Sequence, residues 1–575
     1  MLFDRPNNAD DENNLLGLIS TGRKQFVLGE KVLASDTRRN FRDFRSGVKL
    51  TALVVLVSVA MGVAAWAFLL SLDIATDFRE GHMWIFALLP LVGVGTAWVY
   101  RNHGLAARRG NNLVIDSALS DRLIHLRMAA LTFICSTLTH LTGGSAGREG
   151  AAVQIGGTIA SNVSHLAKLG SRAHHDLMLA GISAAFGSIF GSPLAGAFFG
   201  MEMCFVGKID YTAGIYCLVA SCTGYSTSLA LGAVYEAHRI ASIPALGPKT
   251  IIVAVLAGVA FGFASRVFSA LIRGVKMLYA RLFTNYLVSA LAGSLIVLAA
   301  YALLGAWHYA GLSTWLVGAG FSGKTTLADA LLKLVVTALT LGAGFQGGEV
   351  TPLFGIGAAL GGWFGVISGF DPSFLAALGM LGVFCGGLNV PITTIMMSID
   401  LFHGRGAIYF VIVAFISYLI SGHRGVYPAQ RIVTPKRRSL LVDEGATVAD
   451  AIRRHREIVS ELEESIEQGT SASPSAKTPN EPSDRRSGGN EAGQANTSEY
   501  ADAAENAGAA ESVNAAESVN AAENAGAAES VNADKSEPAN PEPTKPEQTN
   551  PEQANLEQTK PELTSTENRL DASQD

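Results

Sequence analysis

The chain has 575 residues, of which 49% are hydrophobic and only 16% are charged, and it contains 61 glycines. This balance excludes a string of soluble domains and is typical of membrane helices, among which glycine allows close packing. The formal net charge of -6 combines two unlike regions, because the segment from Thr470 onward holds seven basic and twenty acidic residues while the rest of the chain is basic.

The first 47 residues are polar and end in a basic stretch, with four arginines between residues 38 and 45. Positive charge beside a membrane span marks the cytoplasmic side, so we expect residues 1–47 to form a cytoplasmic segment. The first apolar runs that are long enough to span a bilayer cover residues 48–73 and 84–100.

From residue 128 onward the apolar runs are short and are interrupted by glycine, proline or a charged residue. The first series comprises Met128–Leu141, Ala151–Leu166, Leu177–Phe190, Pro193–Val206 and Ile215–Leu231. The second series comprises Ile251–Ile272, Leu287–Leu304, Leu331–Gly344, Pro352–Gly369, Phe374–Gly387, Pro391–Phe402 and Ala407–Ile420. Two such series are typical of transporters whose two halves meet through discontinuous helices.

These patterns predict an all-α polytopic membrane domain over residues 48–435, with halves of about 48–235 and 250–430. Gly191-Ser-Pro-Leu in one half and Asn389-Val-Pro-Ile in the other both place proline at the first turn of a helix. No strong residue-by-residue repeat is evident beyond this pair, so the assignment of two halves depends on the layout of the runs.

Two further segments follow the membrane domain. Residues 436–469 include a stretch with basic and then acidic residues that we interpret as an amphipathic cytoplasmic helix. Residues 470–575 repeat Ala-Ala-Glu-Ser-Val-Asn three times and contain one aromatic residue, Tyr500. Such a composition cannot form a core, so we expect a disordered acidic tail, with both termini in the cytoplasm.

Three glycine-flanked stretches precede helix-forming runs. They are Gly110-Asn111-Asn112, Gly147-Arg148-Glu149-Gly150 and Glu349-Val350-Thr351. The free N–H groups and the dipole at a helix start form an anion site without a full positive charge, so a bound ion can also leave. We expect the three helix starts to converge near the membrane midplane.

Two ionisable residues stand out beside these helix starts. Glu149 is a functional candidate because a carboxylate in an apolar setting is costly, although it could also be a helix-start carboxylate paired with Arg148. Tyr427 follows the last apolar run and could present its hydroxyl to an anion or serve only as an interfacial anchor.

These motifs together resemble the CLC chloride channel and transporter family in order and spacing. The matching stretches are Gly147 to Gly150, Pro193 to Glu202, Gly347 to Pro352, and Tyr427. The resemblance covers roughly residues 45–435. It implies an inverted repeat of two halves and a homodimer with a separate pore in each subunit. By resemblance, Glu149 is the gating glutamate that occupies the anion path and carries the proton, and Tyr427 lines the inner side of the anion site.

Three departures from the common family pattern resemble its fluoride-exporting branch. The first anion loop reads Gly110-Asn-Asn-Leu-Val instead of Gly-Ser-Gly-Ile-Pro, and either Asn111 or Asn112 replaces the serine. Met203 stands where chloride/proton exchangers carry an internal glutamate, and the third motif contains Glu349. The resemblance therefore implies a proton-coupled antiporter that exports fluoride. The alternative is a chloride/proton exchanger or passive chloride channel of the same fold.

Glu349 has two interpretations. It could relay protons to Glu149 in place of an internal glutamate, or it could brace its loop as a carboxylate at a helix N-terminus.

Other functional classes are disfavoured. Gly318-Ala-Gly-Phe-Ser-Gly-Lys-Thr325 fits the P-loop pattern, but it lies between apolar helices instead of after a strand of a nucleotide-binding domain. A membrane scaffold would leave the charged residues at the helix starts unexplained. The five cysteines have no metal-ligand spacing and the basic residues flank spans, so we expect no enzyme activity, cofactor, metal or nucleic-acid partner.

Overall fold

The computed structural model describes residues 8–103, 109–436 and 445–467, all of which belong to one compact unit. Its elements before residue 231 are α1 (Asn8–Gly81), η1 (Met83–Leu88), α2 (Leu89–His103), α3 (Asn111–Ala118), α4 (Arg127–Leu141), α5 (Glu149–Leu166), α6 (Ser171–Phe190), α7 (Pro193–Glu202), β1 (Phe205–Val206), η3 (Tyr211–Ala213) and α8 (Gly214–Ala230). The elements that follow are α9 (Pro248–Leu282), α10 (Tyr286–Leu304), η4 (Trp307–Tyr309), α11 (Trp315–Phe321), α12 (Leu327–Gly342), α13 (Val350–Ser368), α14 (Pro372–Leu388), α15 (Pro391–Phe402), α16 (Ala407–Ser421), β2 (Arg431–Ile432) and α17 (Val448–Glu467). The predicted acidic tail lies outside the described residues.

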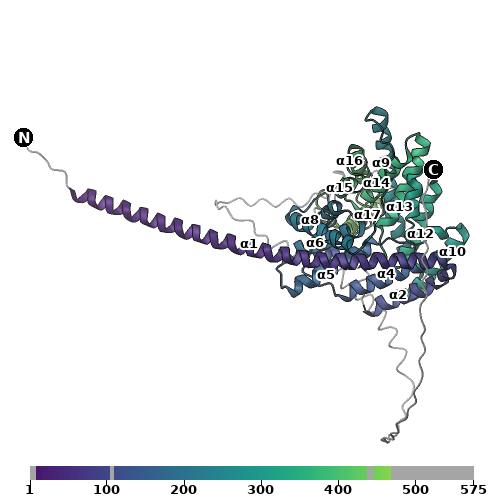
Figure 1. Ribbon diagram of the computed structural model, residues 1–575, viewed down its shortest axis with the longest axis horizontal. Coiled ribbons are helices and arrows are strands. Elements are labelled where there is room, and N and C mark those ends of the chain that lie inside the picture. The colour runs from purple at the N-terminus through teal and green to yellow at the C-terminus, as the bar shows by residue number, and fades with distance from the viewer. Residues whose placement is uncertain (1–7, 104–108, 437–444, 468–575) are drawn as a thin grey trace, which may run out of the picture. The chain divides into compact units, whose positions relative to one another are not determined.

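The helices form two halves that repeat one packing pattern (Figure 1). In the first half α1 packs against α4, α6 and α8, and α6 packs against α5, α7 and α8. In the second half α9 packs against α12, α14 and α16, and α14 packs against α13, α15 and α16. The all-α, two-half architecture expected from the layout of the apolar runs is therefore confirmed, and the discontinuous helices α5, α7, α13 and α15 all start inside it.

The structure also reveals a residue-level repeat that the sequence alone did not. Gly143 and Gly344 both adopt a positive φ, of 87° and 94°, at the same place in the two halves. Other residues recur at the same separation along the chain. The matched pairs are Tyr100 and Tyr301, Gly110 and Gly311, Thr139 and Thr340, Gly143 and Gly344, and Gly147 and Gly348.

Reciprocal helix caps join the two halves. Glu202, at the end of α7, accepts hydrogen bonds from the backbone N–H groups of Ile392 and Thr393 at the start of α15, at 3.1 and 2.8 Å. Asp400, near the end of α15, accepts one from the N–H of Ala195 at the start of α7, at 2.8 Å. Both helices begin with proline in their first turn, as predicted. The two acids are helix-end charges, and each stabilises a helix of the opposite half.

Aromatic side chains fill the junction between the halves. The Phe186 ring of α6 stacks on Phe199 of α7 at 4.2 Å between ring centroids and lies 6.1 Å from Phe384 of α14. Phe354 of α13 connects to Phe384 at 5.3 Å and to Phe190 at 5.2 Å. This cluster fixes α5 and α13, the helices that carry the candidate site, relative to each other through their neighbours α6 and α14.

Five helical segments are long and apolar enough to cross a membrane. They are Arg45–Gly81, Met83–His103, Pro248–Leu282, Tyr286–Leu304 and Val350–Ser368. The first of these continues a helix that begins at Asn8, so α1 runs without a break through the expected end of the N-terminal segment at residue 47. Three shorter apolar helices, Pro372–Leu388, Pro391–Phe402 and Ala407–Ser421, follow the last of the long ones, in agreement with the interrupted runs of the sequence.

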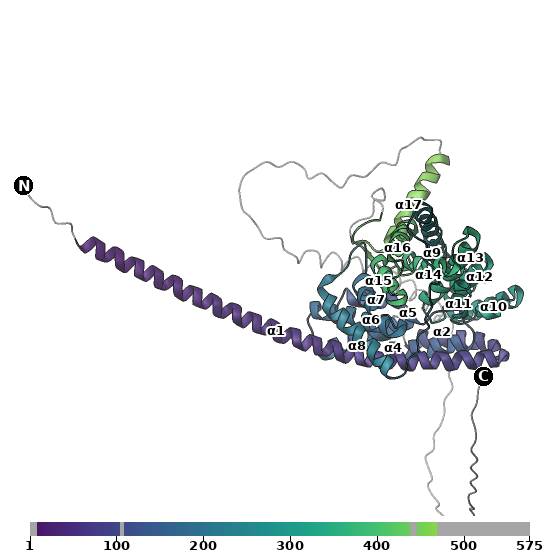
Figure 2. The same ribbon diagram turned by 45° about the horizontal axis from the view of Figure 1, so that its top comes forward.

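The segment after the last membrane helix returns to the domain. Val448 and Ala451 of α17 belong to one cluster of buried residues with Ala414 and Tyr418 of α16. Figure 2 labels the two helices. The strand Arg431–Ile432 pairs in parallel with β1. Within the apolar run from Pro193 to Val206 the helix ends at Glu202, and the last two residues of the run form β1.

The P-loop-like stretch has no nucleotide-binding context. Its first residues belong to helix α11, and after Lys324 and Thr325 the chain enters α12 at Leu327. Because a P-loop needs a preceding strand, this stretch is a helix-to-helix connection and the nucleotide interpretation is dropped.

Candidate functional site

Two glycine loops, one from each half, meet where α5 and α13 begin. Gly147 and Gly348 exchange two backbone hydrogen bonds, each of 2.6 Å. A Cβ on Gly150 would lie 2.8 Å from the Cα of Gly348, so a side chain there would force the loops apart. Glycine at these positions thus lets two helix N-termini come together, as the sequence predicts for the second and third motifs.

The Glu149 carboxylate crosses from the first half to the start of α13. It accepts a hydrogen bond of 3.0 Å from the Thr351 backbone N–H and a second from the Thr351 hydroxyl. The Nε atom of Arg148 lies 3.9 Å from the carboxylate. The Glu149 side chain is 1% exposed, so Thr351, more than the flanking arginine, satisfies its charge.

The first motif contributes one of its two asparagines. The Asn111 side-chain nitrogen donates to the Tyr427 hydroxyl at 3.2 Å, and its Oδ1 atom is buried without a hydrogen-bond partner. Asn112 instead accepts from the Ala429 N–H at 3.1 Å and donates to the Arg109 carbonyl at 3.2 Å. The Asn111 side chain therefore lies beside Tyr427, whereas the contacts of Asn112 brace the loop, and the anion-binding role of either asparagine stays a prediction.

Gly110 determines which of the two asparagine side chains points toward the site. Gly110 has a φ of 56° and caps α3, which begins at Asn111. A left-handed backbone at the cap turns the first helical side chain toward Gly150, where a Cβ would lie 2.9 Å from the Asn111 side-chain nitrogen. The Asp116 carboxylate of α3 accepts a hydrogen bond from Arg109, which precedes the start of this short helix.

Glu349, from the second half, lies close to Gly150. A Cβ on Gly150 would be 3.5 Å from its Oε2 atom, which is buried without a hydrogen-bond partner. Glu349 is the N-cap residue of α13, yet its side chain makes no capping hydrogen bond. The geometry favours a carboxyl that is available for exchange over one that braces the loop.

Two cavities are lined by residues of this site. The first, of about 660 Å³ and named here the Tyr427 cavity, is lined by residues that include Gly110, Asn111, Gln154, Arg273, Lys276, Glu349 and Tyr427. The second, of about 890 Å³ and named the Arg148 cavity, is lined by residues that include Asp73, Arg79, Arg148, Glu236, His238, His308 and Ser313. Glu149 follows Arg148, which lines the second cavity, and Thr351 lies two residues after Glu349, which lines the first.

The Tyr427 cavity has a basic wall. Residues of α9 at helical spacing line it, among them Ser269, Arg273, Lys276 and Ala280. Two cations on one face of the helix favour anions in the water-filled space in front of Asn111.

The Arg148 cavity has mixed charge. Glu236, in the loop before α9, lies 3.6 Å from His238, and this interaction lowers the pKa of the Glu236 carboxyl. Arg148 is the residue of this cavity that adjoins Glu149.

The remaining predicted residues take supporting places. Val350 is buried at the first turn of α13, and Gly147 is held in the bridge between the halves. Among the residues that the structure describes, no group of three His, Cys, Asp or Glu side chains could hold a metal ion.

Sequence reasoning missed Lys333. It treated Leu331–Gly344 as an apolar run, although a lysine interrupts it, and the structure buries this lysine completely. A charged residue within an apolar run was the available signal.

Comparison with known proteins identifies relatives over most of the membrane domain. Residues 92–422 match the family model described as voltage gated chloride channel. The chain is 37% identical to the chloride/fluoride channel protein of Pseudomonas syringae pv. tomato over 69% of this chain and 89% of the relative. It is 24% identical to the H(+)/Cl(-) exchange transporter ClcA of Yersinia pestis bv. Antiqua, over 48% of this chain and 61% of that protein.

A solved structure supports the same relationship. The crystal structure of a CLC-type fluoride/proton antiporter superposes with a TM-score of 0.65 at 32% identity, over 67% of this chain and 98% of that one.

Proposed function

The chain belongs to the voltage gated chloride channel family, and from this premise we propose that it is a proton-coupled antiporter that exports fluoride in exchange for protons. The relative named as a chloride/fluoride channel protein is 37% identical to it and the fluoride/proton antiporter is 32% identical, whereas the named chloride/proton exchanger is 24% identical. A transporter of this family is not an enzyme, and the protein converts no substrate.

One observation carries the proposal: the Glu149 carboxylate occupies the start of α13, where Glu349 lines one cavity and Arg148 lines another. The Thr351 N–H and hydroxyl that hold the carboxylate are the donors that a small anion needs in place of its hydration water. Fluoride and ionised Glu149 therefore compete for the same donors. Once protonated, Glu149 is a weaker acceptor, so it moves aside, and the anion and the proton pass in opposite directions.

The anion approaches through the Tyr427 cavity, which we place on the cytoplasmic side. The basic face of α9 concentrates anions, and the Asn111 amide and the Tyr427 hydroxyl supply neutral donors at its deep end. The absence of a direct cation at these donors, within the described part of the chain, keeps binding weak enough for release.

Protons reach Glu149 through Glu349. The Glu349 carboxyl faces the Tyr427 cavity, has a free buried oxygen and is separated from Asn111 only by Gly150, which has no side chain. Met203, the match to the internal glutamate of exchangers, is buried and cannot titrate. A relay at Glu349 supplies what Met203 cannot.

The test is side-by-side flux in liposomes. Purified protein in vesicles loaded with equal fluoride and chloride should release fluoride much faster, and an inward proton gradient should drive fluoride out against its own gradient. Equal fluoride and chloride rates with proton coupling would favour a chloride/proton exchanger. Flux that no proton gradient can drive uphill would favour a passive channel. The Glu149→Gln variant is the control for coupling.

Location and assembly belong to the same proposal. Five helices with the length and composition of spans, among the described residues, support a multi-pass protein of the cell membrane, with both termini in the cytoplasm. We place two copies in a homodimer, each with its own path. Protease protection of terminal tags and subunit counting by single-molecule bleaching test these two statements.

A further inference from the structure

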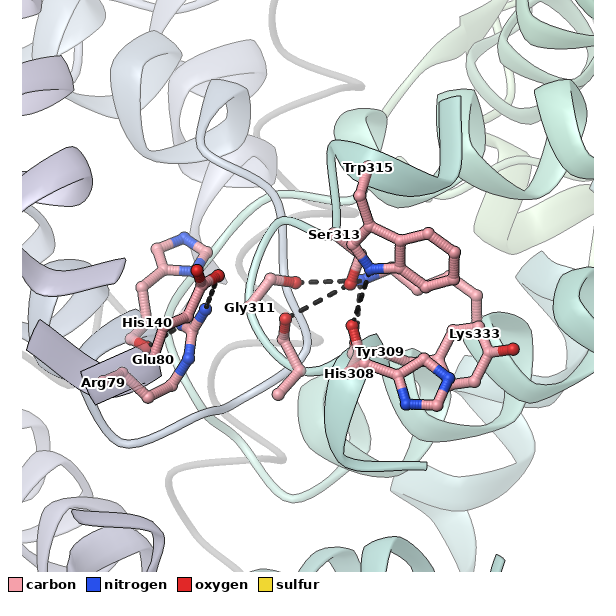
Figure 3. Close-up of polar contacts among 10 residues, drawn as sticks. Arg79, Glu80, His140, His308, Tyr309, Gly311, Ser313, Trp315 and Lys333 are labelled. Carbon is pink, nitrogen blue, oxygen red and sulfur yellow. Dashed lines mark hydrogen bonds and ion pairs between the residues drawn. The ribbon is translucent and has the colours of Figure 1, made fainter. Parts of the chain in front are cut away.

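Lys333 is a fully buried lysine in the middle of α12. Its amino group lies within hydrogen-bond distance of four oxygen atoms (Figure 3). They are the Tyr309 carbonyl at 3.1 Å, the Gly311 carbonyl at 2.8 Å, the Ser313 hydroxyl at 3.0 Å and the Ser145 hydroxyl at 3.0 Å. No carboxylate is among its bonded partners in the described part of the chain.

The four oxygen atoms offset the free-energy cost of burying the lysine amino group away from water. A cation removed from water without a counter-ion is strongly destabilised unless oriented dipoles replace its hydration shell. The two carbonyls can only accept hydrogen bonds, so they require N–H donors, and the two serine hydroxyls complete the shell. A buried lysine held only by neutral oxygens therefore acts as a tether between the segments that supply them.

The fold itself does not require a lysine here. Matched residues of the two halves, such as Tyr100 and Tyr301, share one separation along the chain. At this separation the counterpart of Lys333 in the first half is Thr132. Thr132 is equally buried and donates to the Gln154 side chain at 3.0 Å. A neutral threonine thus fills the equivalent place on α4. Of these two equivalent positions, the one in the second half carries the lysine, and its partner Ser313 lines the Arg148 cavity.

The tether joins two loops that bear on the site. Ser145 belongs to the loop between α4 and α5 that ends at Glu149, and Ser313 belongs to the loop that lines the Arg148 cavity. Other contacts hold the first loop along its length: the Tyr301 hydroxyl donates to the Gly143 carbonyl at 2.7 Å, and the Thr340 hydroxyl accepts from the Ser145 N–H at 3.2 Å. Lys333 is the one contact of this set that also binds the second loop.

We propose that Lys333 is a positioning residue for Glu149: its amino group clamps the Ser145 loop to the Ser313 loop and keeps the Ser145 loop still while the Glu149 side chain moves. This inference rests on the proposed exchange function for its consequence in transport. Its structural part, the clamp between two loops, stands independently of the ion carried.

The first experiment needs no transported ion. Hydrogen–deuterium exchange of the detergent-purified protein should show faster exchange in peptides that cover residues 140–150 and 306–316 when Lys333 is replaced by methionine, with the rest unchanged. The matched control is Lys249→Met, because Lys249 is an exposed lysine at the start of α9 whose amino group lies over the Phe370 ring. Unchanged exchange in both loops, or a rise spread over the whole protein, would overturn the proposal.

The second experiment measures transport. Lys333→Ala should slow fluoride flux about tenfold, the cost of leaving several buried acceptors unpaired, and propylammonium should restore part of it because it replaces the missing amine. Ser145→Ala should have little further effect in the Lys333→Ala background, since its tether is already lost. A lack of rescue together with additive effects would refute the clamp. If the unmodified protein moves fluoride without proton coupling, the proposed function fails while the exchange result still decides the clamp.

Discussion

Replacing Glu149 by glutamine removes the titratable group while keeping the shape of the side chain. The carboxylate accepts two hydrogen bonds from Thr351, and hydrogen bonds to a charged group contribute about 1.5–3 kcal/mol each. Neutral bonds are roughly half as strong, and the amide NH2 cannot accept, so we expect the glutamine side chain to be held more weakly by about 2–3 kcal/mol. This loss of binding free energy lowers the equilibrium constant for placing the side chain at the α13 start by about 30- to 150-fold in the variant.

The assay records fluoride with an electrode and protons with a pH dye in the same liposome suspension. Glu149→Gln should pass fluoride down its gradient and move no protons against theirs, because an amide carries no exchangeable charge. Glu202→Gln is a matched control, since Glu202 caps α15 through the Thr393 N–H at 2.8 Å and hydroxyl at 2.7 Å, the same contacts in another place. Fluoride-driven uphill proton movement in the Glu149 variant, or loss of coupling in both variants alike, would refute the reasoning.

Three further predictions use the same assay. Glu349→Gln should slow proton-coupled exchange by about tenfold or more, as expected for a lost proton donor; exchange at the parent rate would make Glu349 a brace. Asn111→Ala should raise the fluoride concentration needed for half-maximal flux, whereas Asn112→Ala should change it little; equal effects would contradict the assignment of Asn111. Truncation after Gln468 should leave folding, assembly and flux intact, because the removed residues are poor in the apolar side chains that a core needs, and size-exclusion chromatography with flux measurement would reveal an error.

The positions of the short helices could be read from the sequence because glycine and proline mark their ends. The apolar runs that began at Pro391 and at Ala407 correspond to α15 and α16, whose observed bounds are Pro391–Phe402 and Ala407–Ser421. Proline at the first turn and glycine at a left-handed cap are backbone requirements that few residues meet, so they leave a readable signal.

The repeat between the halves could not be predicted from the sequence because only a few widely spaced residues preserve it. It is kept at residues with specific geometry, such as Gly143 and Gly344 with positive φ or Tyr100 and Tyr301 in buried positions. Positions between them face lipid or apolar neighbours, where leucine, valine and alanine are interchangeable. The repeat therefore survives at widely spaced residues that a single sequence does not reveal as a pattern.

The choice between Asn111 and Asn112 depended on the register of one helix start. Two adjacent asparagines are equivalent in composition, but the left-handed conformation of Gly110 points the first toward Tyr427 and the second toward Ala429. Lys333 was missed for a different reason: hydropathy averaged over a run hides one charge, and its partners come from two distant loops.

Glu149 caps a helix of the opposite half, as two other carboxylates of this fold do. Glu202 and Asp400 each carry a carboxylate from one half to a helix start of the other, and neither lines the two cavities beside the site. Glu149 makes the same kind of cross-half cap on Thr351, but the adjoining residues Arg148 and Glu349 line cavities. A carboxylate that caps a helix within a packed junction only stabilises the fold, whereas one that caps a helix beside open space can be replaced by an anion at little cost to the rest of the fold. The gate is thus a joint between the two halves placed where a ligand can compete for it.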